Sequence, residues 1–142
     1  MTNTALGGVQ KAIDEQGLIA DVGTEVRILH IDDDRAFSEL VSTVLQRERD
    51  YFDVVSRTDP RDGLDCLKET GVDCIVSDYE MPGLDGLDVL ERVRDEYPDL
   101  PFVLFTGKGS EEIASEAISK GVTEYLQKGG GTEQYEVLAN RI

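Results

Sequence analysis

The polarity of the chain becomes periodic from residue 26 onward. Short apolar runs rich in β-branched and aromatic residues alternate with segments in which apolar residues recur at the spacing of a helix turn. The first pattern is typical of buried strands and the second of helices that bury one face. We therefore expect helices to separate five strands, over residues 26–31, 51–56, 73–77, 102–105 and 124–127.

The helical segments carry residues that favour helix ends. Aspartate, serine and threonine accept hydrogen bonds at a helix start, proline fits the first turn, and glycine favours the end. Such residues lie at the expected boundaries: Asp34, Asp59 with Pro60, Ser110 and Thr132 at starts, and Gly71 and Gly121 at ends. The first helix is expected over residues 35–48, with an apolar face of Phe37, Leu40, Val41, Val44 and Leu45, and the third near residues 86–96, with Leu87, Leu90 and Val93 inward.

Five strand–helix units in this order predict an α/β fold. Because helices join consecutive strands, we expect a doubly wound parallel sheet with helices on both faces and right-handed crossovers. Residues 26–142 would form this domain, which ends in a short helix. Residues 1–25 show no sustained periodicity, and they are expected to be a poorly ordered N-terminal extension with at most one helical turn at Ala12, Ile13 and Gln16.

The composition adds an extreme charge. The 142 residues include 30 acidic and 14 basic side chains, which gives a formal net charge of −16 at pH 7. Such a surface repels nucleic acids and anionic membranes, so neither is expected as a partner. Concentrated salt would quench the self-repulsion, because the Debye length falls from about 10 Å at 0.1 M to about 3 Å at 1 M. The charge is typical of a halophile's cytosolic protein; an ordinary acidic protein is the alternative.

Three further features favour a cytoplasmic protein. No apolar run is long enough to span a membrane. The first residues lack the basic segment and apolar core of a secretory signal. Cys66 and Cys74 both lie among apolar residues, so we expect them to be reduced core side chains rather than a disulfide.

Polar side chains follow four of the apolar runs. Asp32 and Asp33 follow the first, Asp78 the third, Thr106 the fourth and Lys128 the fifth. In a parallel α/β sheet the carboxyl ends of the strands meet at one edge, where ligands bind. The sequence therefore predicts that these side chains share one crevice.

Three carboxylates, a hydroxyl and an ammonium suit a divalent cation together with a phosphoryl group. Carboxylates at such distances repel one another unless a cation compensates, and oxygen ligands select a hard ion such as Mg²⁺. A carboxylate can also act as a nucleophile and form an acyl phosphate. Phosphoryl transfer needs mainly positioning and charge neutralisation, which Mg²⁺, Lys128 and the Thr106 hydroxyl would supply.

At these positions the sequence resembles the receiver domain of two-component response regulators. The matching segments are His30-Ile31-Asp32-Asp33-Asp34, Ser77-Asp78-Tyr79-Glu80-Met81-Pro82-Gly83-Leu84-Asp85-Gly86, Leu104-Phe105-Thr106-Gly107 and Tyr125-Leu126-Gln127-Lys128. The resemblance extends over about residues 26–142, and the order of the segments makes it specific. It implies a flavodoxin-like five-stranded sheet with the strand order 2-1-3-4-5.

The resemblance also implies how the acidic residues act. Asp78 would be the phosphoacceptor. Asp33 and Asp78 would bind Mg²⁺ directly, as would the backbone carbonyl of Glu80, and Asp32 would act through water. The domain would then be a signalling switch rather than an enzyme, with chemistry limited to its own Mg²⁺-dependent phosphorylation and dephosphorylation.

Three other residues and the partners follow from the same resemblance. Thr106 and Lys128 would contact the phosphoryl group, and Tyr125 would be the aromatic switch that turns inward when the threonine moves. The phosphoryl group would come from the phosphohistidine of a sensor histidine kinase or a phosphotransfer protein. A downstream output protein or a homodimer would carry the signal further. Receivers usually have proline after the lysine, whereas residues 129–131 are all glycine here.

Two alternatives remain open at this point. Asp32 and Asp34 after an apolar strand resemble the nucleophile and acid of haloacid-dehalogenase-type phosphatases, with Thr106 and Lys128 as later motifs. That interpretation leaves Asp78 unexplained and lacks the following acidic pair. The second alternative is a degenerate receiver that binds partners without phosphorylation.

His30 is expected to be a hydrogen-bonded core histidine rather than a phosphohistidine, because its strand is predicted to be buried on both faces.

Overall fold

The centre of the molecule is a five-stranded parallel sheet. The computed structural model describes residues 10–13, 19–22, 25–107, 111–128 and 133–142. The strands of this sheet are β3 (Val26–Ile31), β4 (Phe52–Arg57), β5 (Cys74–Ser77), β6 (Phe102–Thr106) and β7 (Glu124–Gln127). They lie in the order β4-β3-β5-β6-β7, which is 2-1-3-4-5 when counted along the chain. The predicted sheet and its strand order are therefore confirmed.

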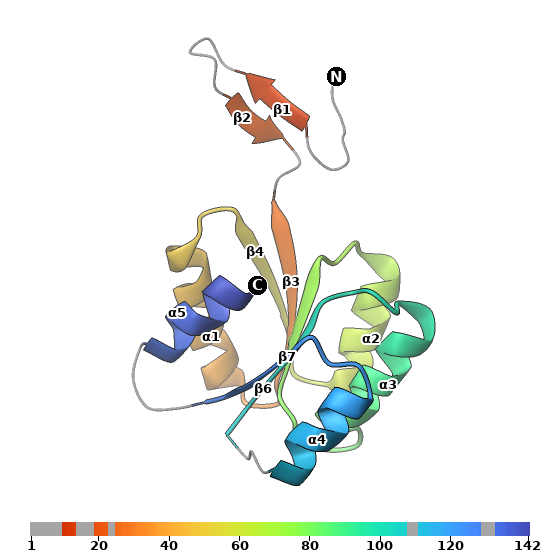
Figure 1. Ribbon diagram of the computed structural model, residues 1–142. Helices are drawn as coiled ribbons and strands as arrows, with labels where there is room; N and C mark the ends of the chain where they lie inside the picture. The colour runs from red at the N-terminus through yellow and green to blue at the C-terminus, as the bar shows by residue number, and fades with distance from the viewer. Residues whose placement is uncertain (1–9, 14–18, 23–24, 108–110, 129–132) are drawn as a thin grey trace.

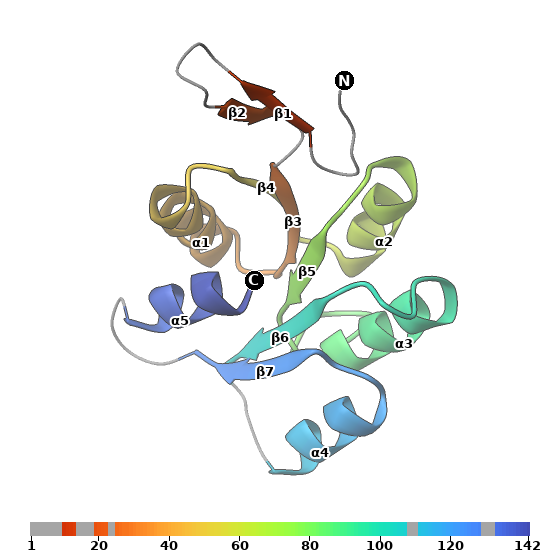
Figure 2. The same ribbon diagram turned by 45° about the horizontal axis from the view of Figure 1, so that its top comes forward.

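Helices cover both faces of the sheet, as predicted (Figures 1 and 2). On one face lie α1 (Arg35–Glu48) and α5 (Glu133–Arg141). On the other lie α2 (Pro60–Glu69), α3 (Gly86–Glu96) and α4 (Glu111–Ser119). Within the described part of the chain, none of the helices combines the length and the apolar character needed to cross a membrane.

Local capping explains where several helices begin. Asp34 accepts the backbone N–H of Phe37 at 3.0 Å, and Asp59 accepts that of Arg61 at 2.9 Å, as the sequence predicts. At the start of α3, Asp85 and Asp88 each accept the other's backbone N–H, a capping box that was not predicted. The other two expected caps, Ser110 and Thr132, lie outside the described residues.

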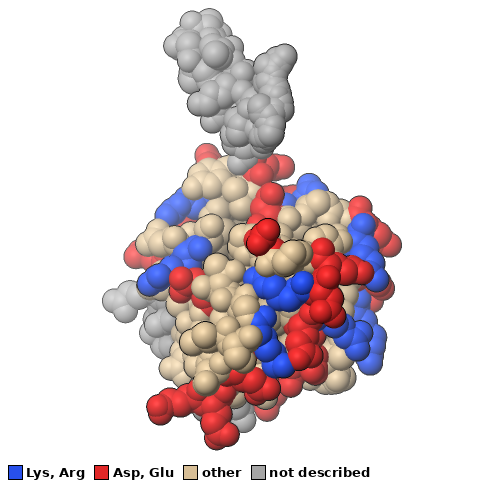
Figure 3. All heavy atoms as spheres, turned by 45° about the vertical axis from the view of Figure 1, so that its right-hand side comes forward, with Lys and Arg blue, Asp and Glu red and all other residues tan. Residues whose placement is uncertain are grey.

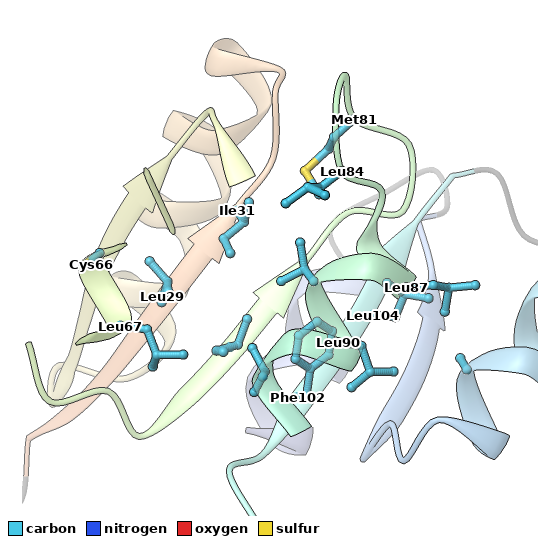
Figure 4. Close-up of a cluster of buried hydrophobic side chains, with 14 residues drawn as sticks. Leu29, Ile31, Cys66, Leu67, Met81, Leu84, Leu87, Leu90, Phe102 and Leu104 are labelled. Carbon is cyan, nitrogen blue, oxygen red and sulfur yellow. The ribbon is translucent and has the colours of Figure 1, made fainter. Parts of the chain in front are cut away.

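Each face of the sheet has its own apolar core. The larger cluster lies between the sheet and α2, α3 and α4, and Figure 4 shows its side chains meeting from these elements. Leu87, Leu90 and Val93 are buried in it, as predicted, and so is Cys66. Cys74 is buried in the second cluster, on the side of α1 and α5. Both cysteines are free, which confirms that they are core side chains rather than a disulfide.

Two of the local expectations are wrong. The apolar spacing places Leu40 on the buried face of α1, but its side chain is 47% exposed. Val41 and Leu45 point into the core, and one residue along a helix turns the side chain by about 100°, which carries Leu40 away from the sheet. The helical turn expected at Ala12 and Ile13 is also absent.

The N-terminal segment instead contains a two-stranded antiparallel sheet. Its strands are β1 (Gln10–Ile13) and β2 (Ile19–Val22). Ile13 is paired with Ile19, a partner several residues away that a local helical pattern does not reveal. Gln16, the third residue of the expected turn, lies outside the described residues.

Candidate functional site

Backbone hydrogen bonds bring the predicted site residues to one edge of the sheet. The N–H of Asp32 donates to the carbonyl of Arg57 at 3.1 Å, and that of Asp78 donates to Ile31 at 2.9 Å. The N–H of Lys128 donates to the carbonyl of Thr106 at 2.9 Å. Because these bonds continue the parallel ladders just past the last strand residues, the side chains that follow the strands emerge side by side.

Three carboxylates form the centre of the site. Oxygen atoms of Asp32, Asp33 and Asp78 all lie within 4.8 Å of one another. Asp32 is 1% exposed and Asp78 is 8% exposed, whereas Asp33 faces solvent. They line an open pocket of about 470 Å³ together with Asp34, Glu80, Met81, Pro82 and Lys128. A set of hard oxygen donors open to solvent on one side suits Mg²⁺, which keeps several of its waters.

Lys128 places its ammonium among these carboxylates. Its Nζ donates a hydrogen bond to Asp32 Oδ2 at 2.9 Å and lies 3.6 Å from Asp78 Oδ1. The fully buried Thr106 hydroxyl makes a hydrogen bond with the Asp78 carboxylate. The structure thus brings together the four strand ends that the sequence predicted.

Asp32 is held at both of its carboxylate oxygens. Oδ1 accepts the backbone N–H of Asp34 at 2.9 Å, while Oδ2 accepts from Lys128. The buried hydroxyl of Ser38, on α1, donates to the Asp32 carbonyl at 3.3 Å. The carboxylate and the backbone carbonyl of Asp32 are therefore both held by hydrogen bonds at the edge of the pocket.

The environment of Asp78 disfavours its negative charge. Burial raises the pKa of this carboxyl above 3.8, and the nearby Asp32 adds to the rise. The Lys128 ammonium and hydrogen bonds from the Tyr79 N–H, at 2.8 Å, and the Thr106 hydroxyl act the other way, but the net shift of the pKa is upward. A carboxylate that is poorly compensated in this way gains from a bound cation.

The loop after Asp78 is packed tightly against it. The N–H of Gly86 donates to the Tyr79 carbonyl at 2.7 Å. A Cβ at Gly86 would lie 2.3 Å from the carbonyl oxygen of Asp78, closer than any real side chain can approach. Gly83, in the same loop, has a φ of 89°, which only glycine adopts without strain. Both glycines are therefore needed for the loop to return to the start of α3.

Two other residues singled out in the sequence, Tyr125 and His30, each bury a polar atom against the core. Tyr125 is half-buried against the larger cluster, and its hydroxyl is buried with no hydrogen-bond partner among the described residues. His30 is buried as predicted, and its Nδ1 has no hydrogen-bond partner among the described residues. Burial, and then the charge of Lys128, lower the pKa of His30 to about 3. A neutral, enclosed imidazole is unsuited to a phosphohistidine role.

A contact that the sequence did not predict completes the site. The Lys128 Nζ lies 4.1 Å from the centre of the Phe37 ring, a cation–π distance. The sequence pattern assigns Phe37 only to the apolar face of α1. No local signal connects two residues so far apart in the chain. The glycines at 129–131, which replace the usual proline, lie outside the described residues.

The fold and site together define a flavodoxin-like α/β protein with an acidic site at the carboxyl edge of its sheet. The model of the response regulator receiver domain matches residues 28–139. The chain belongs to this family, and it is a phosphorylatable switch of a two-component system. The phosphatase alternative is disfavoured further because Asp34, its required acid, caps α1 instead.

Known relatives agree with this family. The transcriptional regulatory protein FixJ of Bradyrhizobium diazoefficiens is 34% identical over 105 residues, which are 74% of this chain and 50% of FixJ. The chemotaxis protein CheY4 of Vibrio cholerae is 27% identical, with a TM-score of 0.74 over 82% of this chain and 98% of CheY4. TrrA of Thermotoga maritima, solved in complex with Mg²⁺-BeF, is 26% identical, with a TM-score of 0.71 over 82% of this chain and 99% of TrrA.

The chain spans about half, or less, of the length of the curated relatives that it matches. The match is thus to the receiver part of these proteins.

Proposed function

We propose that Asp78 is the residue of this receiver that accepts the phosphoryl group, from the phosphohistidine of a sensor histidine kinase or a phosphotransfer protein. One observation carries the proposal. Within the described residues, Asp78 is the carboxylate that both the Thr106 hydroxyl and the Lys128 ammonium approach. The same two groups are suited to hold phosphoryl oxygens once the carboxylate is modified.

The reaction follows from this arrangement. A carboxylate oxygen of Asp78 attacks the phosphorus, and a P–O bond forms as the N–P bond of the donor breaks. The electron pair of that bond returns to the imidazole of the donor, and an acyl phosphate remains on Asp78. Lys128 and Thr106 stabilise the charge on the phosphoryl oxygens. Water later attacks the phosphorus, the P–O bond to Asp78 breaks, and the carboxylate and inorganic phosphate are released.

The oxygen donors of the pocket fit Mg²⁺. Asp33, Asp78 and the backbone carbonyl of Glu80 would bind the ion, and Asp32 would act through water. The spacing of the three carboxylates supports this set, since their oxygens are near enough to share one hard cation. When bound, Mg²⁺ neutralises negative charge between the carboxylates and the phosphoryl oxygens.

The experiment that tests the acceptor is chemical mapping. The protein is treated with acetyl phosphate and MgCl₂, the acyl phosphate is trapped by borohydride reduction, and its peptides are analysed by mass spectrometry. We expect modification at Asp78 and none in a folded Asp78→Asn variant. Modification at Asp32 would support the phosphatase alternative instead. A folded parent that takes up no phosphate from acetyl phosphate or from a phosphohistidine donor would support a degenerate receiver.

We also propose that this protein works at high salt. The net charge of −16 supports this, and Figure 3 shows acidic side chains spread over the face that carries α2, α3 and α4, with basic ones between them. Salt screens the repulsion among such charges. The folded state should therefore become more stable as the salt concentration rises.

The receiver domain is proposed to begin near residue 26. In support, β1 and β2 pair with each other and not with the central sheet. A chain that starts just before β3 should keep the unfolding midpoint and the phosphate uptake of the full chain. A large loss of either would extend the domain into the first 25 residues.

A further inference from the structure

The ammonium of Lys128 has a third neighbour besides the two carboxylates. Phe37 extends from α1, and the centre of its ring lies 4.1 Å from Nζ. The ammonium therefore contacts Asp32, Asp78 and an aromatic face at once. The aromatic contact is part of neither the acceptor nor the metal set described above.

The Phe37 ring is itself held on several sides. It makes tilted ring contacts with Phe105, at 6.1 Å between centroids, and with Tyr135, at 6.5 Å. His30 lies 6.3 Å away on a third side. The backbone N–H of Phe37 is bonded to the Asp34 cap. A ring fixed by β3, β6, α5 and its own helix start presents one defined face to the ammonium.

The Lys128 side chain is 21% exposed, and its ammonium is shared between two carboxylates. The backbone N–H of Lys128 donates to the carbonyl of Thr106 at 2.9 Å, which fixes the start of the side chain at the end of β7. The two carboxylates compete for the ammonium, and the shorter contact is to Asp32 rather than to Asp78. Charge attraction alone therefore favours Asp32 over the acceptor.

We infer that Phe37 is a positioning residue, which holds the Lys128 ammonium over the acceptor by a cation–π contact; this inference rests on the proposed role of Asp78. The face of an aromatic ring attracts a cation and does not titrate. Its pull stays constant while charge moves from the Asp78 carboxylate to the phosphoryl oxygens. The ammonium thus remains in place through the reaction.

A series of fluorinated phenylalanines at position 37 tests this inference. Each added fluorine weakens the attraction of the ring for a cation and changes its shape little. The rate constant for phosphate uptake at saturating acetyl phosphate and Mg²⁺ should fall step by step, by about three- to tenfold at trifluorophenylalanine. The donor concentration at half-saturation should stay constant, because the ring does not touch the donor. The matched control is the same series at Phe52, a buried core residue at the start of β4 and thus at the opposite end of the sheet from Lys128.

A second measurement does not need phosphorylation. The ε-methylene protons of Lys128 should show an upfield NMR shift from the ring current of Phe37, and Phe37→Leu should remove that shift. A flat rate series together with an ordinary ε-methylene shift would overturn the inference. So would a rate that falls only in parallel with the thermal midpoint. If the parent takes up no phosphate, or Asp78→Asn still does, the acceptor proposal fails, and the NMR shift alone decides the role of Phe37.

Discussion

At the amino end of the sheet Arg27 has a carboxylate partner of its own, whereas at the carboxyl end, among the described residues, Lys128 is shared between two carboxylates of a cluster of three. Arg27, near the start of β3, bonds Asp53 on β4 through Nε at 3.0 Å. Its backbone N–H donates to Asp73, just before β5, at 2.8 Å. These bonds tie three neighbouring strands together where they begin.

A second arginine, Arg94, binds the loops that precede β6 and β7 at the same end of the sheet. Arg94, on α3, donates to the carbonyls of Gly121 and Leu100 at 2.8 Å and of Tyr97 at 3.0 Å. One guanidinium therefore fixes the segments that lead into β6 and β7. Donors arranged in a rigid fork make arginine suited to collecting free carbonyls in this way.

The carboxyl end lacks such balance. Asp32, Asp33 and Asp78 cluster there, Lys128 is the cation that the described residues place beside Asp32 and Asp78, and the pKa of Asp78 is raised. The comparison teaches that one end of the sheet carries stability, while the other keeps an excess of negative charge that a cation and a phosphoryl group can use. Substitutions should therefore separate folding from chemistry according to the end they alter.

The largest effect is expected for Arg94→Ala, at the amino end. Loss of its hydrogen bonds should lower the free energy of unfolding by about 2 kcal/mol, because the carbonyls of Gly121 and Leu100 lose a charged donor. The rate of phosphate uptake should change less than about twofold under folding conditions. Urea unfolding followed by circular dichroism measures the first quantity. Arg92→Ala, an exposed neighbour on the same helix, is the control, and an equal loss there would show that Arg94 is not special.

Asp33→Ala, at the carboxyl end, should impair metal binding while leaving stability intact. Removing a direct oxygen ligand should weaken Mg²⁺ binding by at least about tenfold, while stability without Mg²⁺ stays equal or rises because one repelling charge is gone. Tyrosine fluorescence or NMR during a Mg²⁺ titration gives the affinity. Asp95→Ala removes an acid from α3, away from the pocket, as a control. Equal Mg²⁺ affinity in the parent and Asp33→Ala would remove Asp33 from the metal set.

The raised pKa of Asp78 predicts a dependence of stability on pH. The folded chain holds this proton to a higher pH than the unfolded chain, whose carboxyl titrates near 3.8. As pH rises from 3.8 through the higher pKa of the folded state, the stability contributed by protonated Asp78 is therefore lost, and it stays lost at neutral pH.

Asp78→Asn should accordingly be at least as stable as the parent at neutral pH without Mg²⁺, and its advantage should shrink toward acid pH. Urea midpoints from about pH 4 to pH 8 measure this difference. Asp95→Asn makes the same change of charge outside the site. A parent that is more stable than Asp78→Asn at neutral pH would mean that attraction to Lys128 outweighs the cost of burial.

The smallest effect concerns salt and spans the whole surface. The thermal midpoint should rise between about 0.1 M and 1 M KCl as repulsion is screened. A variant in which the exposed Glu111, Glu112 and Glu116 of α4 become glutamine should rise less. General salting-out would raise both proteins alike, so equal slopes would count against adaptation to high salt.

Much of this architecture is local enough to be predicted from the sequence. The bounds of α1 agree with the expected 35–48 because the Asp34 cap and the apolar spacing act within one helix. The site could be predicted because parallel strands must end at one edge, so a polar residue after each strand is sufficient to indicate it. The Asp85–Asp88 box was missed, although two acids at that spacing before an apolar run are a recognisable signal.

The features that were missed depend on contacts between distant segments. The pairing of Ile13 with Ile19 decides that Ala12 lies in a strand. The rotation of α1 on the sheet decides that Leu40 is exposed and Val41 is not. The contact between Phe37 and Lys128 requires both the position of α1 and the end of β7. No periodic pattern in one segment contains this information.

The close approach of Gly86 to the Asp78 carbonyl also limits how the gene can change. Every single-base change that replaces a glycine introduces a side chain or a stop, and each such side chain brings a Cβ to a place only 2.3 Å from that oxygen. Neither residue can shift easily, because Gly86 begins α3 and Asp78 is the proposed acceptor. Random mutagenesis scored by phosphate uptake should therefore recover few active variants with a substitution at Gly86. The exposed residues of α4 should accept many substitutions. Glycine at position 86 should thus tolerate substitution as poorly as the aspartate at position 78.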